Sequence, residues 1–194
     1  LDAQGNDFLA DVVMLDEMQK TLEFKDINAK PIGSWFRGFS APIHVKSSAS
    51  FEDKLFLCVH DSDAFNRWDN AQKLWLDCIL TNESSHQKKL LSAFAELLET
   101  ESDFALLSEM LSLPSENILH QNVSKIDVEE LHVKRENIIH DLLSSLKPTL
   151  LRTYKNLNKN EEFELSPESV GKRALKNLCL MYLTQGGEFE LSLE

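Results

Sequence analysis

The stretch Gly38-Phe39-Ser40-Ala41-Pro42 comes within one residue of the G-x-S-x-G turn that presents the nucleophilic serine of many hydrolases. That turn needs small glycines because the chain passes sharply from a strand into a helix and leaves the serine hydroxyl exposed. Here Pro42 replaces the second glycine, and Ile43-His44-Val45-Lys46 alternates apolar and polar residues as a strand does. We therefore expect Ser40 to lie in an extended segment, with Pro42 at a sheet edge or bulge, and not to act as a nucleophile.

The histidines do not show the spacing of a zinc protease helix, H-E-x-x-H, in which two imidazoles four residues apart share one ion. His132 and His140 are separated by about two turns, roughly 12 Å along a straight helix, which is too far for shared coordination. His60-Asp61 could be a base with its orienting carboxylate, but adjacent side chains on a helix diverge. We expect His60 to end a helix instead. The histidines are His44, His60, His86, His120, His132 and His140.

Other candidate groups also favour a structural interpretation. Glu129-Glu130 and Glu161-Glu162 are acidic pairs in charge-rich stretches, which are typical of solvated faces. Trp68 and Trp75 lie seven residues apart on one helical stripe, which favours core packing over a binding platform. The chain contains neither a phosphate loop nor a dinucleotide fingerprint. The sequence therefore predicts no catalytic, cofactor-binding or metal-ligating residue.

Composition excludes some classes of protein. A net charge of −12 and a pI near 4.9 argue against a nucleic-acid or anionic-membrane partner, which would need clustered Lys and Arg. The apolar runs are too short and too interrupted for a transmembrane span or a secretory signal. Cys58, Cys78 and Cys179 are odd in number and widely spaced, which favours reduced core thiols in a cytoplasmic protein. Because the sequence starts at Leu1, we expect a fragment of something longer.

The first part of the chain, residues 1–49, reads with the two-residue period of strands. Residues 8–15, 21–25 and 35–45 are rich in β-formers or alternate, and Gly5-Asn6 and Pro31-Ile32-Gly33-Ser34 separate them as turns. Three or four strands make at best part of a sandwich, because a sheet normally needs a second layer over its apolar face. We expect the C-terminal part of a small β-sandwich domain. Its unpaired sheet edge would favour dimerisation.

From Ser50 the period changes to that of a helix. Ser50 begins a capping-box-like start, and Ser166 followed by Pro167 begins the last helix, which stops at Gly186. Pro148 predicts a break or kink near 144–147. The fold class we predict is α+β as segregated halves, a partial β-sandwich followed by an all-α bundle or superhelix of about six to eight helices over 50–194. The helices are expected within 50–59, 63–80, 90–98, 104–113, 127–157 and 166–186.

Three blocks in the chain carry a resemblance to a known family. They are Phe39-Ser40-Ala41-Pro42; Asp63, Phe65, Asn66, Arg67, Trp68 and Gln72; and Arg173, Ala174, Leu175, Lys176, Asn177, Cys179 and Leu180. In this order they resemble the region after the catalytic domain of bacterial-type aminopeptidase N, the gluzincin zinc aminopeptidases. The similarity covers nearly the whole chain and is looser over residues 81–125. It implies that the first block ends a small β-sandwich and that the other two lie on helices of a large helical domain.

The resemblance implies that the chemistry of the family lies elsewhere. The zinc ligands, the general-base glutamate and the G-x-M-E-N stretch that holds the substrate's amino group belong to a domain upstream of Leu1, and no position here matches them. The resemblance thus transfers no catalytic residue and no metal ligand. Zinc, peptide substrates and an upstream catalytic domain are implied for the parent enzyme. This chain would be an inactive spacer and a wall of the substrate chamber.

Two functional hypotheses remain open on the sequence. The first is a non-catalytic fragment of a cytoplasmic zinc aminopeptidase. The second is a stand-alone helical scaffold that binds a protein or peptide partner, because amphipathic helices serve both purposes. The reading frame ahead of Leu1 separates them, since the first hypothesis predicts H-E-x-x-H and a further glutamate there.

Overall fold

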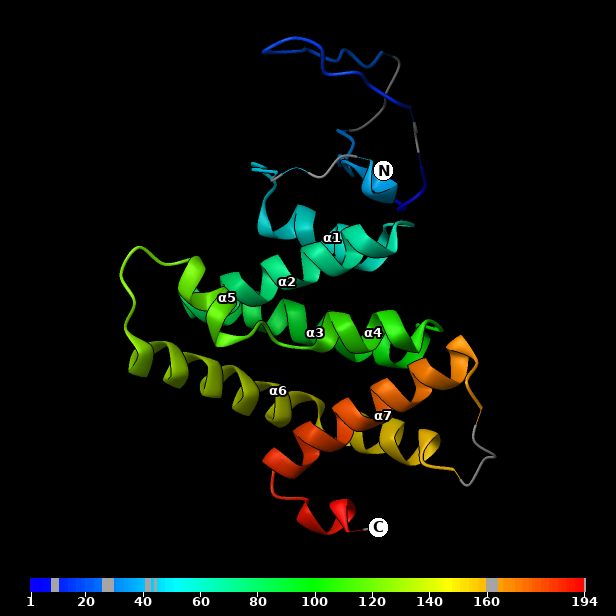
Figure 1. Ribbon diagram of the computed structural model, residues 1–194, viewed down its shortest axis with the longest axis vertical. Helices are drawn as coiled ribbons and strands as arrows, with labels where there is room; N and C mark the ends of the chain where they lie inside the picture. Colours follow the sequence, from blue (N-terminus) through cyan, green and yellow to red (C-terminus); the bar gives the residue numbers. More distant parts are fainter. Residues whose placement is uncertain (8–10, 26–29, 41–42, 44, 160–163, 194) are drawn as a thin grey trace.

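The structure is a computed structural model that describes residues 1–7, 11–25, 30–40, 43, 45–159 and 164–193 (Figure 1). The regular elements of that part are all helical, and η denotes a short 3-10 helix. In chain order they are η1 (Arg37–Phe39), α1 (Phe51–His60), α2 (Ala64–Thr81), α3 (Ser84–Thr100), α4 (Phe104–Leu111), α5 (Glu116–Gln121), α6 (Val128–Leu157), α7 (Pro167–Gln185) and η2 (Phe189–Ser192).

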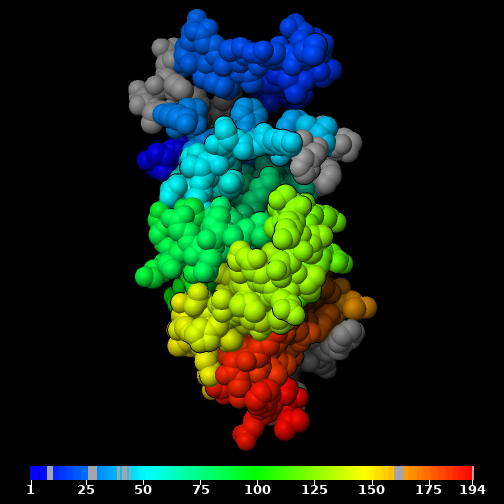
Figure 2. Space-filling view, turned by 90° about the vertical axis from the view of Figure 1, so that its left-hand side faces the viewer, coloured from blue at the N-terminus to red at the C-terminus, as the bar shows by residue number. Residues whose placement is uncertain are grey.

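The helices are stacked in layers along the long axis of the molecule (Figure 1). α1 and α2 contact each other below the N-terminal segment, α3 and α4 lie in the middle, and α6 and α7 pair beneath them. The space-filling view shows the same progression as a continuous change of colour from the N-terminus to the C-terminus (Figure 2). α2 is the most widely connected helix, because it contacts α1, α3, α4, α6 and η1.

One apolar core runs through the stack, and each helix from α1 to α7 contributes buried side chains to it. At its centre the rings of Trp75 and Phe94 stack with centroids 5.2 Å apart. The short helix α5, which the sequence did not predict, joins the core through Leu119. Burying a leucine-sized side chain is worth about 2 kcal/mol, so the stacked apolar stripes are the main source of stability.

Capping residues set the helix starts, as local sequence predicts. Ser50 forms the expected capping box with Asp53 at the start of α1. Ser166 accepts from the backbone N–H of Ser169, and Pro167 takes the first position of α7, which confirms the prediction for that helix. These side chains satisfy backbone donors that a helix cannot pair within itself.

The end of α4 is bound by side chains from two other helices. α4 is only eight residues long, and its last carbonyl groups have no helical partners. Gln72 Nε2 donates to two of the carbonyl oxygens of residues 109–112 at 3.0 and 3.3 Å, and Trp75 Nε1 donates to a third at 2.9 Å. Tyr182 Oη of α7 donates to the fourth at 2.9 Å. α2 and α7 are thereby tied to the same buried helix end.

Pro148 lies inside α6 without ending it. α6 continues for 30 residues across the proline, so the expected break near 144–147 is not found. A proline inside a helix removes one backbone hydrogen bond and costs about 3 kcal/mol. Buried Leu142, Leu146 and Leu150 pack on both sides of it and offset that cost.

The predicted partial β-sandwich is wrong for the described residues. None of the described residues of 1–49 forms a strand, and residues 11–25 are exposed, with Val12 and Met18 86% and 107% accessible. Alternation is a local signal, whereas a strand also needs a partner for its backbone and a second layer over its apolar face. The described N-terminal residues show neither. We expected dimerisation through an unpaired sheet edge, and the described N-terminal residues form no such edge. Residues 8–10, 41, 42 and 44 of the predicted strands lie outside the described residues.

We expect Tyr182→Phe to lower the free energy of unfolding by about 1–2 kcal/mol, because it leaves the Leu111 carbonyl buried without its donor. Urea denaturation followed by circular dichroism measures the loss. Tyr154→Phe is the matched control, since the Tyr154 hydroxyl makes a longer bond of 3.3 Å to Leu191. Equal losses for the two variants would contradict the special role of the α4 end.

Candidate functional site

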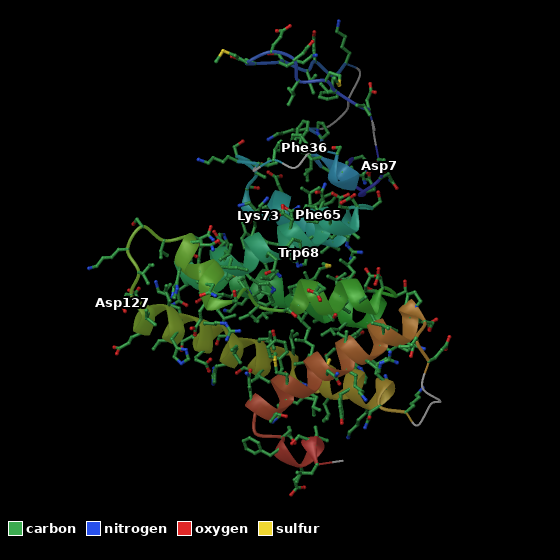
Figure 3. All side chains as sticks on the ribbon, in the orientation of Figure 1. Asp7, Phe36, Phe65, Trp68, Lys73 and Asp127 are labelled. Atoms are coloured by element: carbon green, nitrogen blue, oxygen red, sulfur yellow. The ribbon has the colours of Figure 1, made fainter. Side chains whose placement is uncertain are left out.

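The block that carries the family resemblance on α2 lies where several elements meet. Its polar side chains hold the N-terminal segment, the end of α1 and the loop before α4, and Figure 3 shows this region around Phe65 and Trp68. We call these polar side chains, together with the charged residues beside them, the α2 junction. It consists of Arg37, Asp61, Asp63, Asn66, Arg67, Gln72 and Glu101.

Arg37 binds two acidic residues at the junction. Its Nη1 donates to Asp7 Oδ1 and its Nη2 to Asp61 Oδ1, both at 2.9 Å, and Nη2 also contacts Ser62 Oγ. The Asp61 side chain is fully buried, and it also accepts from the backbone N–H of Asp63. Burial opposes a charge on Arg37, but its hydrogen bonds to Asp7 and Asp61 outweigh that and raise its pKa. A buried carboxylate is tolerated here because a cation faces it.

The backbone beside Arg37 is bent to reach α2. Phe36 has left-handed angles, φ 57° and ψ 35°, and Gly38 follows with φ 63°. A left-handed conformation costs a residue with a Cβ atom about 1–2 kcal/mol. The bend lets the Gly38 N–H donate to Asp63 Oδ2 at 2.8 Å, while Asn66 Nδ2 donates to the Trp35 carbonyl at 3.1 Å. Asp63 also caps α2 with its other oxygen.

Arg67 connects the end of α1 to the loop before α4. Its Nε donates to the Cys58 carbonyl at 3.0 Å, and its Nη1 lies 2.6 Å from Glu101 Oε2. Burial acts to raise the pKa of Glu101, but the backbone N–H of Asp103 and the Arg67 guanidinium outweigh it, so the pKa is lowered. Glu101 therefore remains ionised against its cation.

Ser40 closes η1 with helical angles, φ −60° and ψ −17°, so the expected extended conformation is wrong at this residue. His60 is the last residue of α1, as predicted, and its ring packs on Phe56 with centroids 4.7 Å apart. Asp61 turns to Arg37 instead of His60. The structure therefore does not pair His60 with Asp61 as a base and its orienter.

Three of the other described histidines lie close to acidic residues: His86 to Asp77 and Glu83, His132 to Glu116, and His140 to Asp141. His86 Nδ1 lies 2.6 Å from Asp77 Oδ2, and its ring stacks on Phe51. His132 lies on exposed surface, 3.2 Å from Glu116. Among the described residues, no three side chains that could ligate a metal gather together. His44 and Glu161-Glu162 lie outside the described residues.

The three cysteines are buried and free, which confirms the prediction of core thiols. Burial raises the pKa of Cys58, Cys78 and Cys179 to about 12. They stay protonated at neutral pH, and a thiol in that form is a poor nucleophile and metal ligand.

Glu129 and Glu130 lie in the exposed first turn of α6, which agrees with the solvated face predicted for them. Glu130 pairs with Lys134 four residues later.

Two hollows flank the first turn of α2. The smaller, of about 180 Å³, lies between the N-terminal segment and α2, with Phe36 and Lys73 among its lining residues (Figure 3). The larger is a groove of about 560 Å³ between α2, α4 and α7, lined by Phe65 and Trp68. Trp75 is in the core as predicted, but Trp68 is only half-buried and Phe65 is 39% exposed. The core packing predicted for the two tryptophans is therefore complete for Trp75 and partial for Trp68, which packs against the core while part of its surface stays exposed.

We expect Arg37→Met to expose the N-terminal segment, because Asp61 would keep a buried charge without its cation. Exchange of the Gly38 amide should become at least about tenfold faster, while amides in α6 keep their rates. The double variant with Asp61→Asn removes the stranded charge and should recover part of the protection. Equal exchange in the single and double variants would contradict the ion pair's role.

The Arg67–Glu101 pair predicts a pH dependence. Because the folded pKa of Glu101 is lowered, its stabilisation is present above the unfolded value and is lost as the pH falls through the folded value. We expect Glu101→Gln to cost about 2 kcal/mol at pH 7 and progressively less below about pH 4.5 in urea titrations. Glu99→Gln, which removes an exposed pair with Arg152, should have little effect at either pH. A pH-independent loss for Glu101→Gln would contradict this prediction.

Comparison with known proteins identifies the family. Residues 51–192 match the family described as "Domain of unknown function (DUF3458_C) ARM repeats", and residues 1–48 match "Domain of unknown function (DUF3458) Ig-like fold". The chain is 31% identical to Aminopeptidase N of Caulobacter vibrioides over 87% of its length and 32% identical to that of Escherichia coli over 90%. It spans 20% and 21% of those relatives, about a fifth of each.

A solved structure is similar over nearly the whole chain. It is the crystal structure of Legionella pneumophila aminopeptidase A in complex with aspartic acid, with a TM-score of 0.80 and 28% identity. The match covers 94% of this chain and 23% of that one. The helical stack agrees with the ARM-repeat description of residues 51–192, whereas the described residues of 1–48 show none of the strands of the Ig-like fold named for that region. With these relatives, the chain belongs to the aminopeptidase N family.

Proposed function

We propose that the chain is a non-catalytic part of a zinc-dependent aminopeptidase that removes N-terminal residues from peptides. In that enzyme it acts as a spacer and as a wall of the substrate chamber. The observation that carries the proposal is the agreement in sequence and in fold with proteins named aminopeptidases over about nine-tenths of the chain.

The geometry of the α2 junction supports a mechanical role. Arg37, Asp63, Asn66 and Arg67 each bind backbone or a neighbouring charge, and Gln72 binds the end of α4. Polar residues used in this way stiffen the contact between elements. A stack of helices tied at its joints can keep a fixed shape beside a reaction centre.

The reacting groups in this proposal belong to the upstream catalytic domain. There, zinc would polarise the scissile carbonyl and activate water, and acidic residues would select peptides with a free amino group. No residue of this chain is proposed as a zinc ligand or catalytic group. We propose that the parent enzyme is cytoplasmic, because the three cysteines of this chain are free and buried.

We also propose that the chain divides near residue 49, with 50–194 as the first helices of the helical domain. In support, α1 starts directly after the Ser50 cap, and the two family matches meet between residues 48 and 51. Residues 1–49 are then the part that joins these helices to the rest of the enzyme. The hydrogen bonds from Asn66 and Asp63 to residues 35 and 38 fix that joint.

The proposal predicts that catalysis is lost when the chain is separated from the longer protein. The isolated chain should not hydrolyse alanyl arylamides above the buffer rate. The longer protein should hydrolyse them, lose the activity with a zinc chelator and recover it with added zinc. Chelator-sensitive hydrolysis by the isolated chain would overturn the proposal. A reading frame without H-E-x-x-H upstream would favour the stand-alone scaffold instead.

A further inference from the structure

The larger groove is built at the point where three helices start. It lies between the first turn of α2, the N-terminal half of α4 and the first turns of α7. The rings of Phe65 and Trp68 form one wall, with centroids 5.5 Å apart and planes tilted by 43° (Figure 3). Leu106, Val170 and Ala174 line the other side.

The groove leaves apolar surface in water. Val170 is 47% exposed and Phe65 is 39% exposed, and each lies near the start of a helix that buries several other apolar residues in the core. The polar residues of the same α2 block are occupied by the junction, whereas its two aromatic residues line the groove. A contiguous apolar hollow of this kind is typical of an interaction surface.

The charge of the rim indicates the chemistry of the partner. Asp103 and Glu109 lie at the groove, and no lysine or arginine is among its lining residues. Asp103 caps α4, because its Oδ1 accepts from the backbone N–H of Leu106, so the exposed carboxylate of Glu109 is the main charge that the rim offers to a partner. A segment that presents an apolar anchor next to a Lys or Arg side chain would complement both the floor and the rim.

We propose that this groove is a docking surface for the remainder of the longer polypeptide, which inserts an apolar side chain flanked by a cation between Trp68 and Val170. The inference rests on the proposed function, because the occupant is the part of the enzyme outside this chain. The matched relatives extend well beyond the region that the chain covers, which is about a fifth of their length. The aromatic wall of Phe65 and Trp68 and the acidic rim allow that remainder to bind at a specific position.

The test compares one substitution in two proteins. In the isolated chain, Val170→Asp places an acid in exposed surface in the first turns of a helix, where the helix dipole favours it, so the melting temperature should change by less than about 1 °C. In the longer protein it should lower the melting temperature by at least about 3 °C and speed proteolytic separation of the helical part from the remainder. Glu109→Lys, which repels the proposed cation, should likewise lower the melting temperature of the longer protein and leave that of the isolated chain nearly unchanged.

Val128→Asp is the matched control. Val128 is 55% exposed and also begins a helix, α6, but it does not line the groove. It should leave both proteins unchanged. Equal effects of Val170→Asp in the two proteins, or none in the longer one, would overturn the inference.

Other occupants give other results. If Val170→Asp converts a dimer of the isolated chain to a monomer in sedimentation, the groove serves a second copy and the inference fails. If it raises KM for peptides without changing stability, the groove is a substrate surface and the inference also fails. Thermal shift and proteolysis need no peptidase activity, so an inactive longer protein would refute the proposed function while these readouts still judge the docking surface.

Discussion

The buried end of α4 is the constraint on which the arrangement of the stack depends. A short helix that ends inside a protein leaves carbonyl groups that must find donors, because an unsatisfied buried acceptor costs about 1–3 kcal/mol. Here the donors are Gln72, Trp75 and Tyr182. Because the donors come from α2 and α7, which both contact α4, these two helices are fixed against a common point. Apolar stripes alone would allow neighbouring layers to slide.

α2 connects this end of the stack to the N-terminal segment. Gln72 faces α4, while Asp63, Asn66 and Arg67 face the segment and α1 within about two turns of the same helix. Four polar residues at fixed spacing would otherwise suggest an active site. Their partners are backbone groups, the Ser34 hydroxyl and one carboxylate, so the spacing reflects which elements α2 must join. A residue pattern that identifies a family can thus have a structural cause.

What could be predicted from the sequence was what neighbouring residues determine. The starts of α1 and α7 follow from Ser50 and Ser166, whose side chains act on backbone only three residues away. The strands predicted within residues 8–45 are not found among the described residues of that range, because alternation does not say whether a partner strand exists. Of the break or kink predicted near Pro148, the break is not found, because tertiary packing outweighs a local defect. The role of Arg37 could not be predicted, since Asp61 is 24 residues away in sequence.

The α2 block also separates two kinds of residue by what they bind. Its polar side chains already make hydrogen bonds or ion pairs within the chain. They could bind a partner only by giving up these contacts. Trp68 and Phe65 pack on each other beside α4 and α7 and keep part of their surface in water. In the function that we propose, the internal polar contacts provide rigidity and the apolar surface left outside them provides the attachment to the remainder of the enzyme. The same short segment of α2 therefore stiffens the stack through its polar contacts and presents the aromatic surface of the groove that we propose as the docking surface.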